Sequence, residues 1–353
     1  MQVEDFSRAK GAWNKFAREN RGGVLQSYEW GEFRQEMEWE VSYLGVRDGK
    51  TTRLQALVMR KALPAGYGFY YVPEGPVVKG GDWNDPKNRE AFEAFVAHLE
   101  QRAHEDKTVF MKVDPHLPAE SFPLDWLAQI GFRDSPEDVQ AAVVSEVDLK
   151  PKLEDIFAGF KQKGRYNVRK AVKHGVTVRK GTGEKELEQF YGLLEETAKR
   201  QGITYRKKWY YELFRKHLMQ EHKDAEFLIA YHGQGKEKSP VAAILVTFFG
   251  DEAVYLYGGS TQADRNLYAS YLIQWSGMEE ARRRGCKFYN MTGIAATDDQ
   301  NDSWAGLRQF KLKFGGGQTD LVGARDYVFR PVEYFLFTNA DRVRRKLAKR
   351  SGH

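Results

Sequence analysis

The sequence contains very little cysteine and no long hydrophobic run. Its 353 residues include one cysteine, Cys286, so an intramolecular disulfide is excluded, and no Cys/His cluster has the spacing of a metal site. No stretch approaches the roughly 18 apolar residues that a transmembrane helix needs, and the N-terminal residues lack the apolar segment of a signal peptide. We therefore expect a cytoplasmic protein without a metal, not integral to a membrane but able to contact its surface.

The familiar phosphate-binding and hydrolytic motifs are missing as well. The three glycines of "GLRQFKLKFGGGQTD" (306–320) follow the lysines, whereas a Walker loop needs its lysine after the glycines. No G-x-G-x-x-G follows a strand, and neither G-x-S-x-G nor H-E-x-x-H occurs. Apolar and basic residues alternate ahead of the glycines, which predicts a strand with one packed face and one basic face, followed by a turn.

The chain is moderately basic, with a formal net charge of +6. Lysine and arginine concentrate at 161–181, 204–217, 281–287 and 341–353, the last overlapping an expected amphipathic helix at 331–350. Solvated helix faces account for much of this charge. The clusters also suit a partner that carries phosphates, such as a nucleotide, tRNA or an anionic lipid head group.

The order of the expected elements divides the chain into two α/β (α+β) domains. Each half begins with helices, continues with a strand meander and ends with a helix and a closing strand. The final helix and strand are expected at 91–115 in the first half and at 269–293 in the second. We expect domain 1 to comprise 1–148, completed by 315–353, and domain 2 to comprise 149–314. Two similar α/β domains would place a cleft between them.

This order of elements suits the fold of acyl-CoA-dependent N-acyltransferases. Their pyrophosphate loop, R/Q-x-x-G-x-G/A, presents backbone amides at a helix N-terminus. The corresponding stretch here is "DRNLYASYLIQW" (264–275), in which no glycine follows Arg265. The sequence therefore predicts an acyltransferase fold without a CoA site.

Seven segments stand in the order found in one family. They are "LQSYEWGEFRQ" (25–35), "YYVPEGPVV" (70–78), "FMKVDP" (110–115), "GRYNVRKAVKHGVTVRKG" (164–181), "RQGITYRKKWYYELF" (200–214), "YLYGGS" (255–260) with "NLYASYLIQWSGMEEARRRGCKFYNMTGI" (266–294), and "GLRQFKLKFGGG" (306–317). Over nearly its whole length the chain resembles the FemABX family of peptidoglycan-bridge aminoacyltransferases. The absence of a long helical arm makes it similar to the compact, FemX-like type.

The resemblance implies two tandem GNAT-like domains, no CoA requirement and no other cofactor. Family members take an amino acid such as Gly, Ala or Ser from aminoacyl-tRNA. They transfer it to the side-chain amine of the third residue of the peptidoglycan stem peptide, carried on UDP-MurNAc-pentapeptide or on a lipid-linked precursor such as lipid II. The product forms interpeptide bridges, which implies roles in cell-wall biogenesis and cell shape.

The resemblance also implies roles for seven residues. Phe310 and Lys311 match the family's Phe-Lys pair at the reaction centre. The substrate-binding positions are Arg206 and Tyr210 at the nucleotide diphosphate, Tyr257 on the same ligand, Arg34 where compact members have a lysine, and Asp114 in the substrate channel. Asn290 stands where the family commonly has Asp, which argues against an acid at that position.

The chemistry of the residues agrees with these roles. Aminoacyl transfer from an ester to an amine passes through an oxyanion, which the Lys311 ammonium would stabilise. Two interpretations of Asp114 stay open, a turn cap and a site acid. Two other hypotheses also stay open: an acyl-CoA-type N-acyltransferase with a degenerate loop, and a non-catalytic protein that binds RNA or a membrane surface through its basic clusters.

Overall fold

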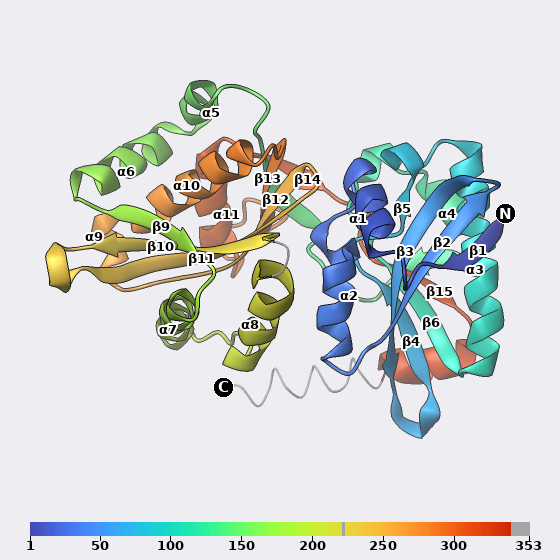
Figure 1. The fold of residues 1–353 in the computed structure, drawn as a ribbon. Helices are drawn as coiled ribbons and strands as arrows, with labels where there is room; N and C mark the ends of the chain where they lie inside the picture. Colours follow the sequence, from blue (N-terminus) through green and yellow to red (C-terminus); the bar gives the residue numbers. More distant parts are fainter. Residues whose placement is uncertain (221–222, 340–353) are drawn as a thin grey trace. The chain divides into compact units, whose positions relative to one another are not determined.

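The chain forms two compact α/β units, each built around its own sheet (Figure 1). The computed structural model describes residues 1–220 and 223–339. Unit 1 comprises Met1–Ala142 and the chain from Leu321 on, and unit 2 comprises Val143–Asp320. The strands at 143–148 and 317–320, which the sequence placed in domain 1, pair within the sheet of unit 2.

Unit 1 holds an eight-stranded sheet in the order β1-β2-β3-β4-β6-β15-β7, with β5 paired to β3. Its strands are β1 (Gln2–Asp5), β2 (Glu40–Asp48), β3 (Thr51–Ala62), β4 (Gly68–Val72), β5 (Val77–Val78), β6 (Thr108–Val113), β7 (Phe132–Asp134) and β15 (Arg325–Val328). Its helices are α1 (Lys10–Glu19), α2 (Tyr28–Gln35), α3 (Pro86–Glu105) and α4 (Leu124–Gln129). The core between α3 and the sheet is rich in aromatic side chains such as Phe92 and Phe95.

Unit 2 holds a seven-stranded sheet in the order β14-β8-β13-β12-β11-β10-β9. Its strands are β8 (Val143–Asp148), β9 (Thr177–Gly181), β10 (Ala225–His232), β11 (Ser239–Phe249), β12 (Glu252–Ser260), β13 (Phe288–Gly293) and β14 (Gly317–Asp320). Its helices are α5 (Leu153–Gly159), α6 (Gln162–Lys173), α7 (Glu184–Gln201), α8 (Lys208–Phe214), α9 (Asp264–Leu267), α10 (Ala269–Arg283) and α11 (Ala305–Lys311). In Figure 1, α6 and α10 cover one face of this sheet, and α7 and α8 cover the other.

The helix–strand pairs expected at 91–115 and 269–293 are α3–β6 and α10–β13. Each closing strand runs parallel to a strand of the preceding meander, β6 to β4 and β13 to β12. Because the other pairings in both sheets are antiparallel, each unit contains a single parallel pair among the described strands. This shared pattern is the repeated unit that the sequence predicts.

The prediction of a strand before the glycine triplet is wrong. Residues 305–311 form helix α11, and Leu312–Phe314 continue it as a 3-10 turn that ends at Gly315, whose φ is 75°. The buried positions Ala305, Arg308, Lys311 and Phe314 recur every third residue, as on one side of a helix. Two of these buried residues are cations. Because a helical period is read from the spacing of apolar residues, these cations hid the period in the sequence.

The helix expected at 331–350 is only partly covered by the described residues. It is helical over 331–339, and its remainder lies outside the described residues. In unit 2, α8 is followed by a π-helical turn, Arg215–Gln220.

Packing of β12 against α7 requires a glycine at position 259. A Cβ at Gly259 would lie 2.4 Å from the Leu193 carbonyl oxygen, whereas one at Gly192 on the same helix would meet nothing within 4 Å. We expect Gly259→Ala to lower the free energy of unfolding by about 1–3 kcal/mol, because backbone atoms must move apart. Gly192→Ala should raise it by up to about 1 kcal/mol through helix propensity. Urea unfolding of both variants measures this, and equal stabilities would contradict the packing.

Candidate active site

The parallel strands β12 and β13 of unit 2 separate after three paired residues. The register pairs Glu252 with Phe288, Ala253 with Tyr289 and Val254 with Asn290. Beyond that point β12 continues on β11 as far as Ser260, while β13 continues on β8 as far as Gly293. We call the place where the two strands part, beyond Val254 and Asn290, the fork.

The side chain of Lys311 reaches from the last turn of α11 to the fork. Its Nζ donates to Thr292 Oγ1 at 3.0 Å and to the Gly293 carbonyl oxygen at 2.8 Å, both on β13. The same ammonium lies 5.8 Å from the ring centre of Tyr255 on β12. Lys311 therefore contacts both strands just beyond their last pair, and only 3% of its surface is exposed.

Thr292 holds its hydroxyl toward Lys311 through an unusual backbone conformation. Its φ is 62°, in the left-handed region that a β-branched residue rarely adopts, and it lies in the irregular pairing of β13 with β8 between Asn290 and Gly293. The Thr292 amide donates to Asn290 Oδ1 at 2.7 Å, and Asn290 Nδ2 donates to Glu252 Oε1 at 3.0 Å. Asn290 thus braces the bulge rather than acting as an acid. Backbone strain of this kind concentrates at functional sites.

Burial lowers the pKa of Lys311 to about 7. The cause is loss of hydration, since its two hydrogen-bond acceptors in the fork are neutral oxygens. A lysine with a pKa near neutrality can hold or release a proton under physiological conditions, which surface lysines do not do.

Phe310 packs beside this lysine without entering the fork. Its ring centre lies 5.1 Å from that of Tyr271 on α10 and 5.3 Å from that of Phe314. Lys313 donates to the Tyr271 hydroxyl at 3.1 Å. Phe310 therefore fixes α11 against α10, which sets where the Lys311 side chain starts.

A second group of predicted residues meets around β12 and α8. The hydroxyls of Tyr210 and Tyr257 lie 3.5 Å apart, and the Arg206 guanidinium lies 5.8 Å from the Tyr210 ring centre. Helix α8 begins at Lys208, so Arg206 precedes it, and the two residues do not share a helix face. The loop before α8 nevertheless brings them together, with Arg206 exposed.

One strand connects these two groups. Tyr255 contacts Lys311 and belongs to the core beneath α6 and α10, whereas Tyr257 contacts Tyr210 and Tyr211 of α8. Residues two apart on a regular strand share a face. Here the register of β12 on β11 shifts, so that Leu245 pairs with Tyr257 and Val246 with Tyr255. The resulting bulge at Leu256 directs the two tyrosines to different faces.

The two predicted residues of unit 1 lie in different settings. The Arg34 guanidinium lies 5.0 Å from the ring centre of Trp39 and 5.9 Å from that of Trp30. Asp114 is buried, and it accepts hydrogen bonds from the Tyr71 hydroxyl and the Glu74 amide, both at 2.7 Å. Loss of hydration raises the pKa of Asp114 to about 7 despite these bonds. The carboxyl thus ties the end of β6 to the backbone at Glu74, which follows β4.

The N-terminus of α10, where a CoA pyrophosphate would bind, carries a carboxylate of the chain itself. Asp264 Oδ1 accepts from the Ser270 amide at 2.9 Å, and its other oxygen accepts from the Ser270 hydroxyl. An acidic side chain satisfies the helix amides and the positive end of the helix dipole. Desolvation nevertheless raises the pKa of Asp264, because the carboxyl is largely buried.

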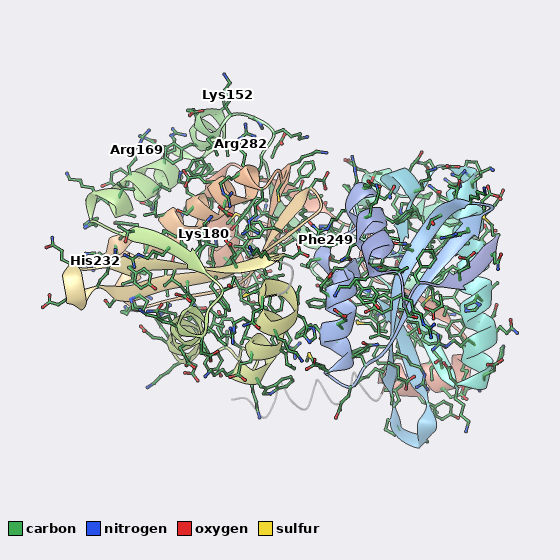
Figure 2. The ribbon with its side chains drawn as sticks, in the orientation of Figure 1. Lys152, Arg169, Lys180, His232, Phe249 and Arg282 are labelled. Carbon is green, nitrogen blue, oxygen red and sulfur yellow. The ribbon has the colours of Figure 1, made fainter. Side chains whose placement is uncertain are left out.

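Many cations of the expected basic clusters have structural partners. In Figure 2, Arg169 is labelled on α6 and Lys180 on β9. The Arg169 guanidinium lies 5.4 Å from the Phe157 ring centre, and Lys180 forms an ion pair with Glu280 at 2.5 Å.

Among residues 1–220 and 223–339, no three His, Cys, Asp or Glu side chains are grouped to hold a metal ion. Over the same residues, no helix has the length and apolar composition required to cross a membrane.

Sequence reasoning named Lys311 as a candidate but missed the residues that contact its ammonium. Tyr255 and Thr292 contact its ammonium directly, and neither had been singled out. The pair Tyr255 and Tyr257 in "YLYGG" was a visible signal, but the bulge between them was not. Nothing in "YNMTGI" marks Thr292 as left-handed.

Comparison with known proteins covers almost the whole chain. The model of the FemAB family matches residues 10–129, 128–232 and 214–342. Lipid II:glycine glycyltransferase of Staphylococcus aureus (strain COL) is 23% identical over 400 residues, covering 93% of this chain and 92% of that protein.

Solved structures show the same fold. The crystal structure of FemX superposes with a TM-score of 0.87 at 20% identity, covering 95% of this chain and 99% of that chain. A tandem GNAT protein from the clavulanic acid biosynthesis pathway gives a TM-score of 0.50 at 13% identity, covering 82% of this chain and 83% of that chain. The predicted fold class, two tandem GNAT-like units, is confirmed.

The Thr292 hydroxyl can be tested as an acceptor for Lys311. Thr292→Val keeps the shape but removes the oxygen, so the charged amine loses a partner and we expect its pKa to fall further, by about 1 unit. Stability should also fall by roughly 1–3 kcal/mol, the cost of a buried unpaired donor. Thr292→Ser retains the oxygen and is the matched control. NMR titration of the Lys311 amine and urea unfolding measure both effects. An unchanged pKa in Thr292→Val would show that the hydroxyl does not support the ammonium.

Proposed function

This chain belongs to the FemAB family and is an aminoacyltransferase, and we propose that it uses aminoacyl-tRNA to extend a peptidoglycan precursor. The amino acid, Gly, Ala or Ser, is joined to the side-chain amine of the third residue of the stem peptide, for interpeptide bridge formation. The observation that carries the proposal is the buried ammonium of Lys311 at the fork of unit 2. The relative from Staphylococcus aureus is named for glycine and lipid II, which supports a lipid-linked acceptor. A UDP-linked acceptor rests on the family resemblance alone.

Lys311 would act on the developing oxyanion. The acceptor amine attacks the ester carbonyl carbon, the C=O electrons move to oxygen, and the tetrahedral intermediate collapses by expelling the ribose oxygen of the tRNA. A proton passes from the attacking nitrogen to that leaving oxygen. An ammonium has three N–H groups, and Lys311 uses two on Thr292 and Gly293, so the third can donate to the oxyanion. The ester is already activated, so the step needs no strong protein base.

The group around Tyr257 suits the diphosphate of the acceptor. Arg206 is exposed and lies beside Tyr210, and a guanidinium can bind pyrophosphate oxygens in bidentate fashion. The hydroxyls of Tyr210 and Tyr257 are close enough to donate to the same ligand. We assign Arg34 and Asp114 to the acceptor as well, on the family resemblance alone.

A CoA thioester is the less suitable donor. Its pyrophosphate would compete with the Asp264 carboxylate for the amides at the start of α10, and it would also be repelled by that charge. We therefore propose that the enzyme requires no CoA and no other cofactor.

One experiment tests donor and acceptor together. The protein is incubated with a mixture of aminoacyl-tRNAs and either UDP-MurNAc-pentapeptide or a lipid-linked precursor, and the products are analysed by mass spectrometry. We expect the mass of one or more added amino acids, and we expect RNase treatment to abolish it. Product formation that is indifferent to RNase, or that depends on acetyl-CoA, would overturn the proposal.

Removal of the Lys311 amine should slow catalysis strongly. We expect Lys311→Ala to reduce kcat by about 10²–10³, the usual effect of deleting one oxyanion donor. Lys287→Ala, at an exposed lysine just before β13, is the matched control and should retain wild-type kcat. Steady-state kinetics with the acceptor identified above measure both. Retention of turnover in Lys311→Ala would exclude the proposed role.

The pH dependence distinguishes an ammonium from a neutral base. With a pKa of about 7, Lys311 carries its proton below that pH and loses it above. The ratio of wild-type to Lys311→Ala activity cancels ionisation of the acceptor amine. This ratio should stay constant below pH 7 and fall about tenfold per pH unit above it, as the charged fraction falls. A ratio that rises with pH would instead identify Lys311 as a base.

A further inference from the structure

Helix α6 of unit 2 lies in a long stretch of positive charge. From 156 to 183 the sequence contains eight Lys and Arg residues and no Asp or Glu. The surface of a soluble protein ordinarily mixes charges of both signs. A helix within such a one-sign stretch is therefore a candidate surface for an anionic partner.

The charge of α6 lies on the side that faces away from the core. The buried residues of the helix share one side and are Gly164, Asn167, Val168 and Ala171. The opposite side and its flanks carry, in order along the helix, Lys163, Tyr166, Arg169, Lys170 and Lys173. We call these five residues the basic face of α6. Tyr166 is 55% exposed, and the Lys170 ammonium lies 5.8 Å from its ring centre.

The cations of the basic face differ from those of the other basic clusters in having no carboxylate partner. At 281–287, for example, Arg283 forms an ion pair with Glu280, and Lys287 forms one with Asp251. In the described part of the chain, no Asp or Glu forms an ion pair with a cation of the basic face. Its positive charge is therefore available to a ligand.

The stability of the helix does not explain this charge. Lys163 lies in the first turn, at the positive end of the helix dipole, where a cation is unfavourable. Arg169 and Lys173 are four residues apart, a spacing at which like charges repel each other. Lys170 and Lys173 suit the negative end of the dipole, but an anion along the helix would favour all four cations.

The first turn of α6 packs on the segment that follows Lys311. The Lys161 amide donates to the Lys313 carbonyl oxygen at 3.0 Å, and a Cβ at Gly164 would lie 2.4 Å from the same oxygen. The helix therefore begins beside α11, which carries the candidate catalytic lysine, and both belong to unit 2. From Lys163 to Lys173 the basic face extends over about 15 Å.

We propose that the basic face of α6 binds the phosphate backbone of an RNA near its 3′ end, with one unpaired base stacked on Tyr166. Cations spaced around an exposed aromatic ring suit RNA, because phosphates neutralise the cations and any base can stack on the ring. A lipid surface is less suitable, since the exposed large apolar side chains of α6 are Tyr166 and Val172, too few to enter a bilayer. The identity of this RNA as the aminoacyl-tRNA donor rests on the proposed function.

Binding of deacylated tRNA to the whole protein tests this surface without an acceptor or a transfer reaction. The variant combines Arg169→Ala, Lys170→Ala and Lys173→Ala, all at positions that are not buried. We expect at least a tenfold loss of affinity. The slope of log affinity against log salt should become smaller by about 2–3, because each lost phosphate contact contributes roughly 0.7–0.9. Fluorescence anisotropy at a series of KCl concentrations measures both quantities.

A second triple variant is the matched control. Lys150→Ala, Arg283→Ala and Lys287→Ala remove the same charge from exposed side chains of unit 2 that pair with carboxylates. This variant should bind tRNA as tightly as the wild type does, and thermal unfolding checks that both triple variants fold. Equal losses of affinity in the two would show that net charge alone governs binding and would overturn the proposal.

The stacked base is tested at Tyr166. Tyr166→Ala should weaken tRNA binding about tenfold, the usual effect of losing one base stacked on an aromatic side chain. The salt slope should not change, because no phosphate contact is lost. Tyr166→Phe keeps the ring and is the matched control. Equal affinities of the alanine and phenylalanine variants would exclude the stacked base.

Failure of this RNA surface and failure of the proposed function give different results. If the wild type binds tRNA and the α6 triple variant binds it equally well, the basic face is not the RNA site and the proposed function stands. If the wild type binds no tRNA at low salt, both are wrong. A triple variant that retains tRNA binding but no longer floats with phosphatidylglycerol vesicles would identify a lipid surface instead.

Kinetics connect the surface to catalysis if the function is as proposed. The α6 triple variant should raise KM for aminoacyl-tRNA at least tenfold and keep the wild-type kcat, because it weakens donor binding and leaves Lys311 in place. Lys311→Ala should instead lower kcat. An α6 triple variant with the wild-type KM for aminoacyl-tRNA would contradict the assignment of this face to the donor.

Discussion

Burial of one ammonium is the constraint on which the rest of unit 2 depends. A charged group taken out of water must find polar partners, and Lys311 finds its two on β13 only because the strand bulges there. The bulge in turn requires a left-handed Thr292, which Asn290 and Glu252 brace through a chain of hydrogen bonds. Fork, bulge and helix α11 therefore form one structural unit, in which the left-handed backbone at Thr292 positions an acceptor for Lys311.

The two units end their parallel strand pair differently. In unit 1 the register of β4 on β6 shifts between Gly68 and Tyr70, the pairs then run from Tyr70 to Val72, where β4 ends, and Asp114 ties the end of β6 to the Glu74 amide. In unit 2 the pair β12–β13 also has three residues in register, but both strands continue beyond it on other neighbours. The Lys311 ammonium lies in the opening between these two strands.

The sequence predicted the architecture better than the local geometry. Hydrophobic periodicity identified α3–β6 and α10–β13, because ordinary apolar residues face the core there. It failed at α11, because Arg308 and Lys311 are charged residues at buried positions and a hydropathy pattern assigns charged residues to the exposed face. The roles given to Lys311, Tyr210 and Tyr257 came from the family resemblance. The positions of the Tyr255 and Thr292 side chains depend on two β-bulges, which the residue types at those positions do not predict. Backbone irregularities arise from tertiary pairing, and local propensity does not encode them.

The carboxylate at the start of α10 has a consequence for selectivity between metabolites. Asp264 is covalently attached to the helix it caps, so its local concentration is far above that of any diffusing anion. An abundant acyl-CoA in the cell would have to displace this permanent competitor before it could bind. An internal occupant of the anion position therefore raises the concentration at which such an anion binds there, by a factor set by that local concentration.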